Sequence, residues 1–110
     1  WLHGDLQAGN LLAVQGRLSA VIDFGCLGLG DPACDVMAAW LHLERETRDL
    51  FRAVLQVDDA TWLRGRGWAL SVGLIALPYY QDTNPVLAGI ARRAIEAAFE
   101  MNKTIIKGDN

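Results

Sequence analysis

The stretch that decides the fold is His3-Gly4-Asp5-Leu6-Gln7-Ala8-Gly9-Asn10, a polar loop followed by short apolar runs at residues 11–14 and 18–23. Between the two runs, Gln15-Gly16-Arg17 is typical of a turn, because glycine takes positive φ without steric cost. The pattern therefore predicts a β-hairpin directly after the polar loop.

The chain beyond the hairpin carries helical periodicity. Asp31-Pro32 supplies an N-cap and a proline at the first helical position, so a helix is expected from there to about residues 42–45. Three further helices are predicted: from about 46 to 57, from Asp58 or Asp59 to about 80 with an apolar central part, and from Thr83-Asn84-Pro85 onward. The side chains expected to face inward are Val36, Ala39, Trp40 and Leu43, then Leu50, Phe51, Val54 and Leu55, and finally Leu87, Ile90, Ala94, Ile95, Ala98 and Phe99.

The predicted fold class is mainly α with a small β-hairpin (α+β), four helices following a loop and a hairpin. The chain has 110 residues, enough for one domain with a modest core. Within it we expect loop, hairpin and a second loop in residues 1–30, helices in 31–102 and a tail in 103–110. Because the sequence begins at Trp1 without an initiator Met, we expect a piece of a longer protein.

Composition narrows the classes of function. The net charge is -3, and the basic residues are scattered apart from Arg92-Arg93, so a nucleic-acid partner is not expected. No apolar run approaches the ~20 residues that cross a bilayer, and no signal peptide is recognisable, which favours a cytoplasmic protein without membrane contact. Cys26 and Cys34 match neither a zinc nor a CxxC redox spacing, so both are expected to be reduced structural thiols.

Three polar residues of the loop and hairpin carry the chemistry. A hairpin brings the ends of its strands together, so Asn10 and Asp23 should lie side by side. Mg²⁺ prefers oxygen ligands and takes only one or two of them from protein, leaving the others to water and phosphates. Asp5, just before the hairpin, would face the same site as a general base. The alternative is that all three are turn residues kept for local hydrogen bonds.

The residues His3-Gly4-Asp5 to Asn10 (HGDxxxxN), Val21-Ile22-Asp23-Phe24-Gly25, and Gly28-Leu29-Gly30-Asp31-Pro32-Ala33-Cys34-Asp35 together resemble one family. This family comprises the aminoglycoside phosphotransferases and their choline-kinase-like relatives, which share the catalytic lobe of protein kinases. The resemblance runs through the chain in order, with the specific motifs in the first 36 or so residues. It implies the C-terminal catalytic lobe of a kinase-like fold.

The resemblance also implies roles for individual residues. Asp5 matches the residue that orients the acceptor hydroxyl and takes its proton, while Asn10 and Asp23 match the Mg²⁺ ligands under the phosphates of ATP or GTP. Asp35 matches a helix carboxylate that braces the loop, or else it simply favours the helix N-terminus. His3 matches a packing residue. Residues 3–10 are called the catalytic loop below, and residues 23–30 the metal loop.

The family's nucleotide-gripping N-terminal lobe has no counterpart in the sequence. Its strand lysine has no match, because the only lysines are Lys103 and Lys107. We therefore expect the chain alone to be inactive as a kinase. We also expect apolar surface near Leu2, Leu6 and Phe24 to be exposed, which would favour a homodimer.

Several classes of phosphate acceptor are compatible with these motifs. A polycationic aminoglycoside would suit acidic side chains in the helical part, and choline-like, amino-acid, macrolide or sugar acceptors are alternatives. Aromatic residues could line the acceptor pocket, although core positions are commoner for such residues; they are Trp40, Trp62, Trp68, Tyr79 and Tyr80. A contrasting hypothesis is a non-catalytic helical binding or remnant module with inherited motifs.

Overall fold

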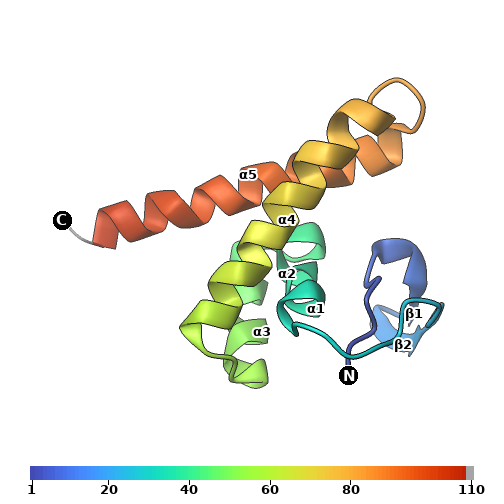
Figure 1. Cartoon of the computed structure of the whole chain (residues 1–110), viewed down its shortest axis with the longest axis horizontal. Coiled ribbons are helices and arrows are strands. Elements are labelled where there is room, and N and C mark those ends of the chain that lie inside the picture. Colours follow the sequence, from blue (N-terminus) through green and yellow to red (C-terminus); the bar gives the residue numbers. More distant parts are fainter. Residues whose placement is uncertain (109–110) are drawn as a thin grey trace.

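The computed structural model describes the backbone of residues 1–108 and the side chains of residues 1–100. A short 3₁₀ turn and a hairpin precede the helices: η1 (Ala8–Asn10), β1 (Leu11–Val14), β2 (Arg17–Val21), α1 (Ala33–Val36), α2 (Ala38–His42), α3 (Arg45–Leu55), α4 (Asp59–Tyr80) and α5 (Pro85–Gly108). Figure 1 shows the hairpin on one side of the molecule and the C-terminus on the other. The fold is mainly helical with one hairpin, as predicted.

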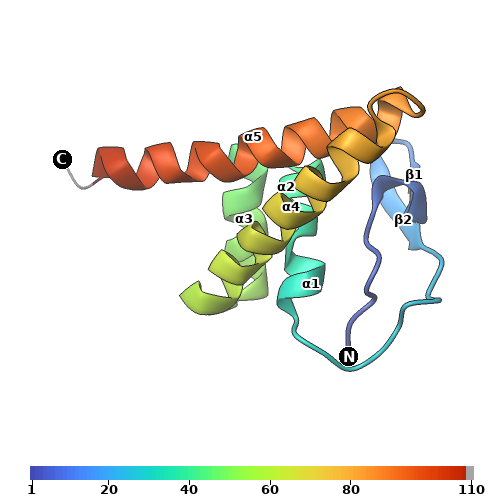
Figure 2. The same cartoon turned by 45° about the horizontal axis from the view of Figure 1, so that its top comes forward.

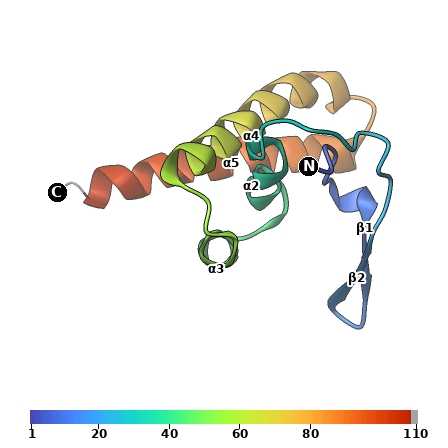
Figure 3. The ribbon, with the colours of Figure 1, turned by 60° about the horizontal axis from the view of Figure 1, so that its bottom comes forward.

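The hairpin forms where the turn residues predict it. Gln15 and Gly16 both have positive φ, 52° and 77°, which matches the twist of a two-residue antiparallel connection. The strands pair antiparallel, with an irregularity between Leu12 and Ala13. The hairpin projects from the helical part (Figure 3), and its tip is exposed.

The first predicted helix is divided into two. Asp31 caps it as expected, since its Oδ1 accepts from the Ala33 N–H at 3.1 Å. Met37 separates α1 from α2, and the Trp40 N–H donates to the Met37 carbonyl, an i to i−3 bond. One tight 3₁₀-like turn therefore interrupts the helix, which the apolar spacing alone does not reveal.

The inward face predicted for α3 is wrong. Leu50, Val54 and Leu55 are exposed, by 64%, 75% and 44%, and of the four predicted residues Phe51 alone packs against the core. The other inward position is held by Arg48, which is 6% exposed and donates to the Leu43 carbonyl at 2.8 Å. Because α3 lies to one side of the other helices (Figure 3), it has a narrow contact and needs few apolar residues.

The central helix is α4, which packs against α1, α2 and α5. Its start is capped by Asp58, whose carboxylate accepts from the Thr61 N–H at 2.7 Å, and Asn84 caps α5 in the same way through the Leu87 N–H. Figure 2 shows α5 crossing α4. At Gly73 the approach is so close that a Cβ would lie 2.9 Å from the Ala91 carbonyl oxygen.

The core lies between these helices and is rich in small residues. Trp40 is fully buried, and its ring lies 4.6 Å from that of Trp62. Around this pair the buried cluster consists of Val36, Ala39, Ala69 and Ala97. Among the α5 side chains that the structure describes, residues 85–100, the buried positions are all alanine, namely Ala88, Ala91, Ala94, Ala97 and Ala98, whereas Phe99 of the predicted stripe is 52% exposed.

The last helix is longer than predicted. It continues through Gly108, so the prediction of a tail is wrong for residues 103–108, while residues 109–110 lie outside the described part. No glycine or proline lies between Gly89 and Gly108, and glycine is a common residue just where helices end. Among the described residues, no helix is long and apolar enough to cross a membrane.

Candidate functional site

Asp35 holds the start of the catalytic loop from α1. Its Oδ2 accepts from the His3 N–H at 2.7 Å, and its Oδ1 accepts from the Gly4 N–H at 2.9 Å. Hydrogen bonds to an ionised acceptor are stronger than neutral ones, and a carboxylate with two donors fixes both position and direction. The loop before Asp5 is thus tied to the first helix, the geometry that a bracing role requires.

His3 is buried at the point where the catalytic loop meets the hairpin. Its Nδ1 accepts from the Asp5 N–H at 3.1 Å, so the proton resides on Nε2, which donates to the Ile22 carbonyl at 2.9 Å. The ring also contacts Phe24 edge-on, with centroids 4.6 Å apart. Both nitrogens are engaged, so His3 positions Asp5 and the residues on either side of Asp23.

Asn10 connects the loop to the hairpin and is 6% exposed. Its Nδ2 donates to the Asp5 carbonyl at 2.9 Å and to Asp5 Oδ2 at 3.1 Å. The amide nitrogen is thereby engaged, which leaves Oδ1 as the atom that a cation could use. The Asn10 carbonyl accepts from the Ile22 N–H at 2.9 Å, so the hairpin base sets Asn10 beside the residue that precedes Asp23.

Asp23 ends the hairpin in a left-handed conformation with φ 58°, which Asp tolerates better than most residues. Its Oδ1 accepts only a long bond, 3.4 Å, from the Gly25 N–H, and the residue is exposed. Within the described residues no cluster of three or more His, Cys, Asp or Glu could hold a metal. One carboxylate and one amide oxygen nevertheless fit Mg²⁺, which keeps water and phosphate as its other ligands.

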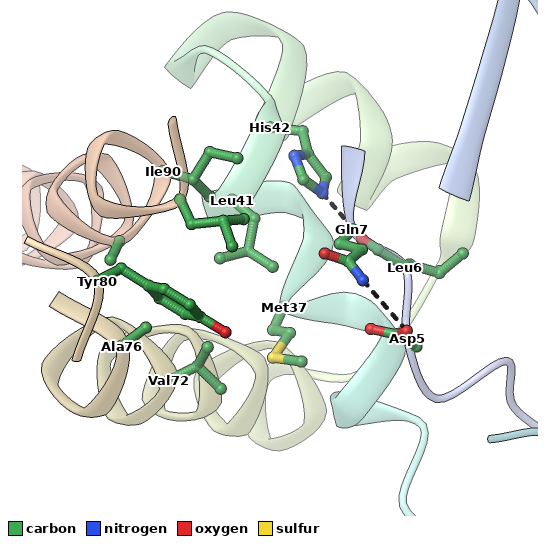
Figure 4. Close-up of a pocket in the computed structure, with 12 residues that line it drawn as sticks. Asp5, Leu6, Gln7, Met37, Leu41, His42, Val72, Ala76, Tyr80 and Ile90 are labelled. Atoms are coloured by element: carbon green, nitrogen blue, oxygen red, sulfur yellow. Dashed lines mark hydrogen bonds between the residues drawn. The ribbon is translucent and has the colours of Figure 1, made fainter. Parts of the chain in front are cut away.

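Asp5 opens onto a pocket of about 180 Å³. Its Oδ2 accepts from Asn10 and, at 3.3 Å, from Gln7 Nε2. Figure 4 shows Asp5 at one end of the pocket and Tyr80 projecting into it from α4. The walls come from the catalytic loop, α2, α4 and α5, with Met37 between α1 and α2; the lining residues are Asp5, Leu6, Gln7, Met37, Leu41, His42, Val72, Ala76, Tyr80, Leu87, Ile90 and Ala91.

His42 is a positioning residue that sequence reasoning missed. Its Nε2 lies 2.8 Å from the Leu6 carbonyl and donates to it, which ties the loop residue after Asp5 to the end of α2. The only signal in the sequence was a histidine in the last turn of a helix, where any basic residue is favourable. Of the aromatic residues considered for the pocket, Tyr80 lines it, Trp40 and Trp62 are core, and Trp68 and Tyr79 are exposed.

An ion pair fixes the far end of the metal loop. Arg64 Nε and Nη2 donate to the two oxygens of Asp31 at 2.8 and 3.2 Å. The side-chain hydrogen bond from Arg64, helped by the Ala33 N–H, holds the pKa of Asp31 below its usual value. Cys26 and Cys34 are free thiols, and burial, reinforced by Asp31 and Asp35, raises the pKa of Cys34 and favours its inert protonated form.

Comparison with protein families gives the class of protein: a phosphotransferase. A model of the phosphotransferase enzyme family (APH) matches residues 1–68, which include the catalytic loop, the hairpin, the metal loop and Asp35. The chain belongs to this family. No curated protein and no solved structure matches it.

Proposed function

We propose that the chain carries the phosphoryl-transfer site of a small-molecule kinase, which moves the γ-phosphate of a Mg²⁺-bound ATP or GTP to a hydroxyl group. The observation that carries the proposal is the amide of Asn10, whose nitrogen donates to the Asp5 carboxylate and whose oxygen is left for a cation. From the family's motifs, the acceptor that we first expect is aminoglycoside-like. Because the nucleotide is cytoplasmic, we place the reaction in the cytoplasm.

Asp5 is the residue proposed to orient the acceptor hydroxyl and to accept its proton. One of its oxygens is fixed by Asn10 and Gln7, so the other is free to meet a hydroxyl in the pocket. The backbone on either side is held by His3 and His42. Such fixed positioning is most of what a protein contributes to phosphoryl transfer.

Asn10 Oδ1 and the Asp23 carboxylate are the proposed Mg²⁺ ligands. When bound, the ion neutralises charge on the phosphate oxygens. Asn10 reaches this position from the buried hairpin base, whereas Asp23 reaches it from an exposed loop with a nearly unengaged carboxylate. We propose that Asp23 is drawn onto the cation when the nucleotide arrives.

Exposed apolar side chains on the metal loop support the expected self-association. Phe24, Leu27 and Leu29 are exposed by 52%, 52% and 76%, and Trp1 is exposed by 85%. Leu2 and Leu6, which were also expected to be exposed, are half-buried. We propose that a second copy of the chain covers these exposed side chains.

The test separates the roles of the two carboxylates. Titration calorimetry of Mg²⁺-ATP into the chain should show weaker binding for Asp23→Asn and nearly unchanged binding for Asp5→Asn. In a preparation competent for transfer, either the chain alone or the chain fused to a nucleotide-binding lobe, Asp5→Asn should lower turnover by roughly 10²- to 10⁴-fold.

The matched control is Asp82→Asn, an exposed carboxylate in the turn between α4 and α5, which should change neither quantity. Equal loss of nucleotide affinity in the Asp5 and Asp23 variants would show that the roles are assigned wrongly. Unchanged behaviour of all three variants would favour a non-catalytic helical module.

A further inference from the structure

The pocket beside Asp5 is mainly apolar, and this property bears on the acceptor. Two thirds of its lining residues have aliphatic or thioether side chains, contributed by the catalytic loop, by Met37 between α1 and α2, and by α2, α4 and α5: Leu6, Met37, Leu41, Val72, Ala76, Leu87, Ile90 and Ala91. Figure 4 shows several of them gathered around the ring of Tyr80. A ligand in this space meets hydrocarbon on most sides.

Most of the polar groups in the pocket are already engaged. Gln7 donates to Asp5, and His42 donates to the Leu6 carbonyl. Asp5 is the one carboxylate among the lining residues. The Tyr80 hydroxyl, Gln7 Oε1 and His42 Nδ1 have no hydrogen bond within the described part of the chain. The pocket thus offers one carboxylate, and its other unengaged polar atoms carry no negative charge.

Three acidic side chains of the helical part are paired with arginines. Glu44 accepts from Arg93 at 2.7 Å, Glu100 pairs with Arg48 at 3.4 Å, and Asp59 pairs with Arg52. Glu44, Glu96 and Glu100 line a separate hollow between the end of α2 and α5. None of them reaches the space beside Asp5.

The groove that continues from this pocket does not add negative charge. It shares Leu41, His42 and Ile90 with the pocket and extends over the first turns of α5. The one ionisable side chain that it adds is Arg93, a cation. Because Arg93 is paired with Glu44, an acceptor that outgrows the pocket meets apolar surface and an ion pair with no spare carboxylate.

A polycation is poorly matched to this environment. One ammonium group could pair with Asp5, but that would occupy the proposed base, and every further ammonium group would lose water without gaining a carboxylate. A neutral apolar molecule gives up no strongly bound water, and burial of its surface in the pocket lowers the free energy. The volume of about 180 Å³ suits a body of about one saturated ring.

We propose, building on the function proposed above, that the acceptor is a neutral alcohol with an apolar body rather than a polycationic aminoglycoside. Its hydroxyl meets Asp5 and the Tyr80 hydroxyl, while its body lies against Met37, Val72 and Ile90. The pocket disfavours a polycation because it lacks further carboxylates, and it favours a neutral alcohol because its walls are apolar.

The test compares three probes of one ring size: cyclohexylmethanol, which is apolar and neutral; myo-inositol, which is neutral and hydrophilic; and 2-deoxystreptamine, which carries two ammonium groups. Each is titrated into the 110-residue chain labelled at methionine and isoleucine methyl groups, and the shifts of Met37 and Ile90 are followed by NMR. We expect cyclohexylmethanol to shift both methyl groups with an affinity about tenfold or more above the other two probes.

A pair of variants on α4 tests the role of charge. Ala76→Asp places a carboxylate in the pocket wall and should raise the affinity for 2-deoxystreptamine while lowering it for cyclohexylmethanol. Ile75→Asp, one residue away and 70% exposed, is the matched control and should change neither. Circular dichroism of each variant establishes that the helices are retained.

Each outcome decides the proposal. Tighter binding of 2-deoxystreptamine to the unmodified chain, or no shift of Met37 and Ile90 with any probe, would overturn the neutral-alcohol assignment. These measurements use no nucleotide, so they are separate from the titration that tests phosphoryl transfer. Alcohol binding in a chain that fails to bind Mg²⁺-ATP would contradict the proposed kinase function and leave the ligand class standing.

Discussion

The catalytic loop and the metal loop are held in opposite ways. Side chains from other elements fix the catalytic loop, since Asp35 binds two of its N–H groups and His42 binds one of its carbonyls. Within the loop, Asn10 binds Asp5 itself. The metal loop is held by its own short turn, from the Leu27 N–H to the Phe24 carbonyl, by a backbone bridge to Leu2 at Gly28, and by the Asp31–Arg64 ion pair just beyond its end.

The difference matches what the two proposed roles demand. A base must already be in place when a hydroxyl arrives, because a small displacement costs much of the rate. A cation attracts its ligands, so a loop that carries a metal ligand can be completed on binding. The site is therefore rigid at Asp5, where position matters most, and less constrained at Asp23.

The largest effect is expected where the two loops touch, at Gly4. Its φ is 88°, and a Cβ would lie 2.6 Å from the carbonyl oxygen of Cys26 in the metal loop. Gly4→Ala should lower the free energy of unfolding by roughly 3–5 kcal/mol, through backbone strain and the clash. Urea unfolding measures this change.

Gly9→Ala is the matched control within the same loop. A Cβ at Gly9 would have open space around it to 4 Å, and the φ of Gly9 is not positive, so Gly9→Ala should change the stability little. Equal effects of the two substitutions would mean that the loops are not in contact at Gly4.

The second effect concerns Asp35. Asp35→Ala removes the acceptor of two partly buried N–H groups, those of His3 and Gly4, and should cost about 2–4 kcal/mol. Hydrogen exchange should accelerate at the His3 and Gly4 amides and remain slow in α4. Asp35→Asn, which keeps one acceptor oxygen, should fall between the wild type and Asp35→Ala; no change at either amide would contradict the bracing role.

A smaller effect is expected at His42. His42→Ala removes the hydrogen bond to the Leu6 carbonyl and should cost about 1 kcal/mol. In a transfer-competent preparation it should lower kcat more than it raises KM for the nucleotide, because it loosens the residue next to Asp5. His42→Gln, which can still donate, should restore part of the loss, whereas a merely structural role would leave kcat unchanged.

The smallest effect is the pH dependence at the far end of the metal loop. Because Arg64 lowers the pKa of Asp31 in the folded chain, this pair adds stability above the usual carboxyl value of 3.8 and loses it as the pH falls through the lowered pKa. Both groups are exposed, so the change is small. The urea midpoint of Asp31→Asn should lie below that of the wild type at neutral pH and approach it as the pH falls well below 3.8; a constant difference would contradict the linkage.

Local signals in the sequence predicted much of the fold. Gly16 indicates the turn, and Asp58 and Asn84 indicate helix starts, because each acts on backbone groups within a few residues. The inward face of α3 and the break at Met37 depend on neighbours far along the chain, which spacing does not encode.

In the site, too, features set by neighbouring residues could be predicted, whereas features set by distant residues could not. The motifs located Asp5 and Asn10, which lie within one loop and are in direct contact. The bond between His42 and Leu6 joins residues 36 positions apart, and the pocket needs α2, α4 and α5 packed together. Such features arise only once the helices are assembled.

The close crossing of α4 and α5 has a consequence for conformational entropy. A Cβ at Gly73 would meet the Ala91 carbonyl oxygen, Ile95 and Ala94, and neither Gly73 nor the two alanines have side-chain rotamers to lose when the helices pack. The crossing therefore forms with less of the ordering cost that long side chains would bring. Because backbone meets backbone here, the separation of α4 and α5 is fixed, and the pocket walls that they carry, Val72 and Ile90 among them, are held at that spacing. Discrimination among acceptors by size should therefore be sharp between these two helices.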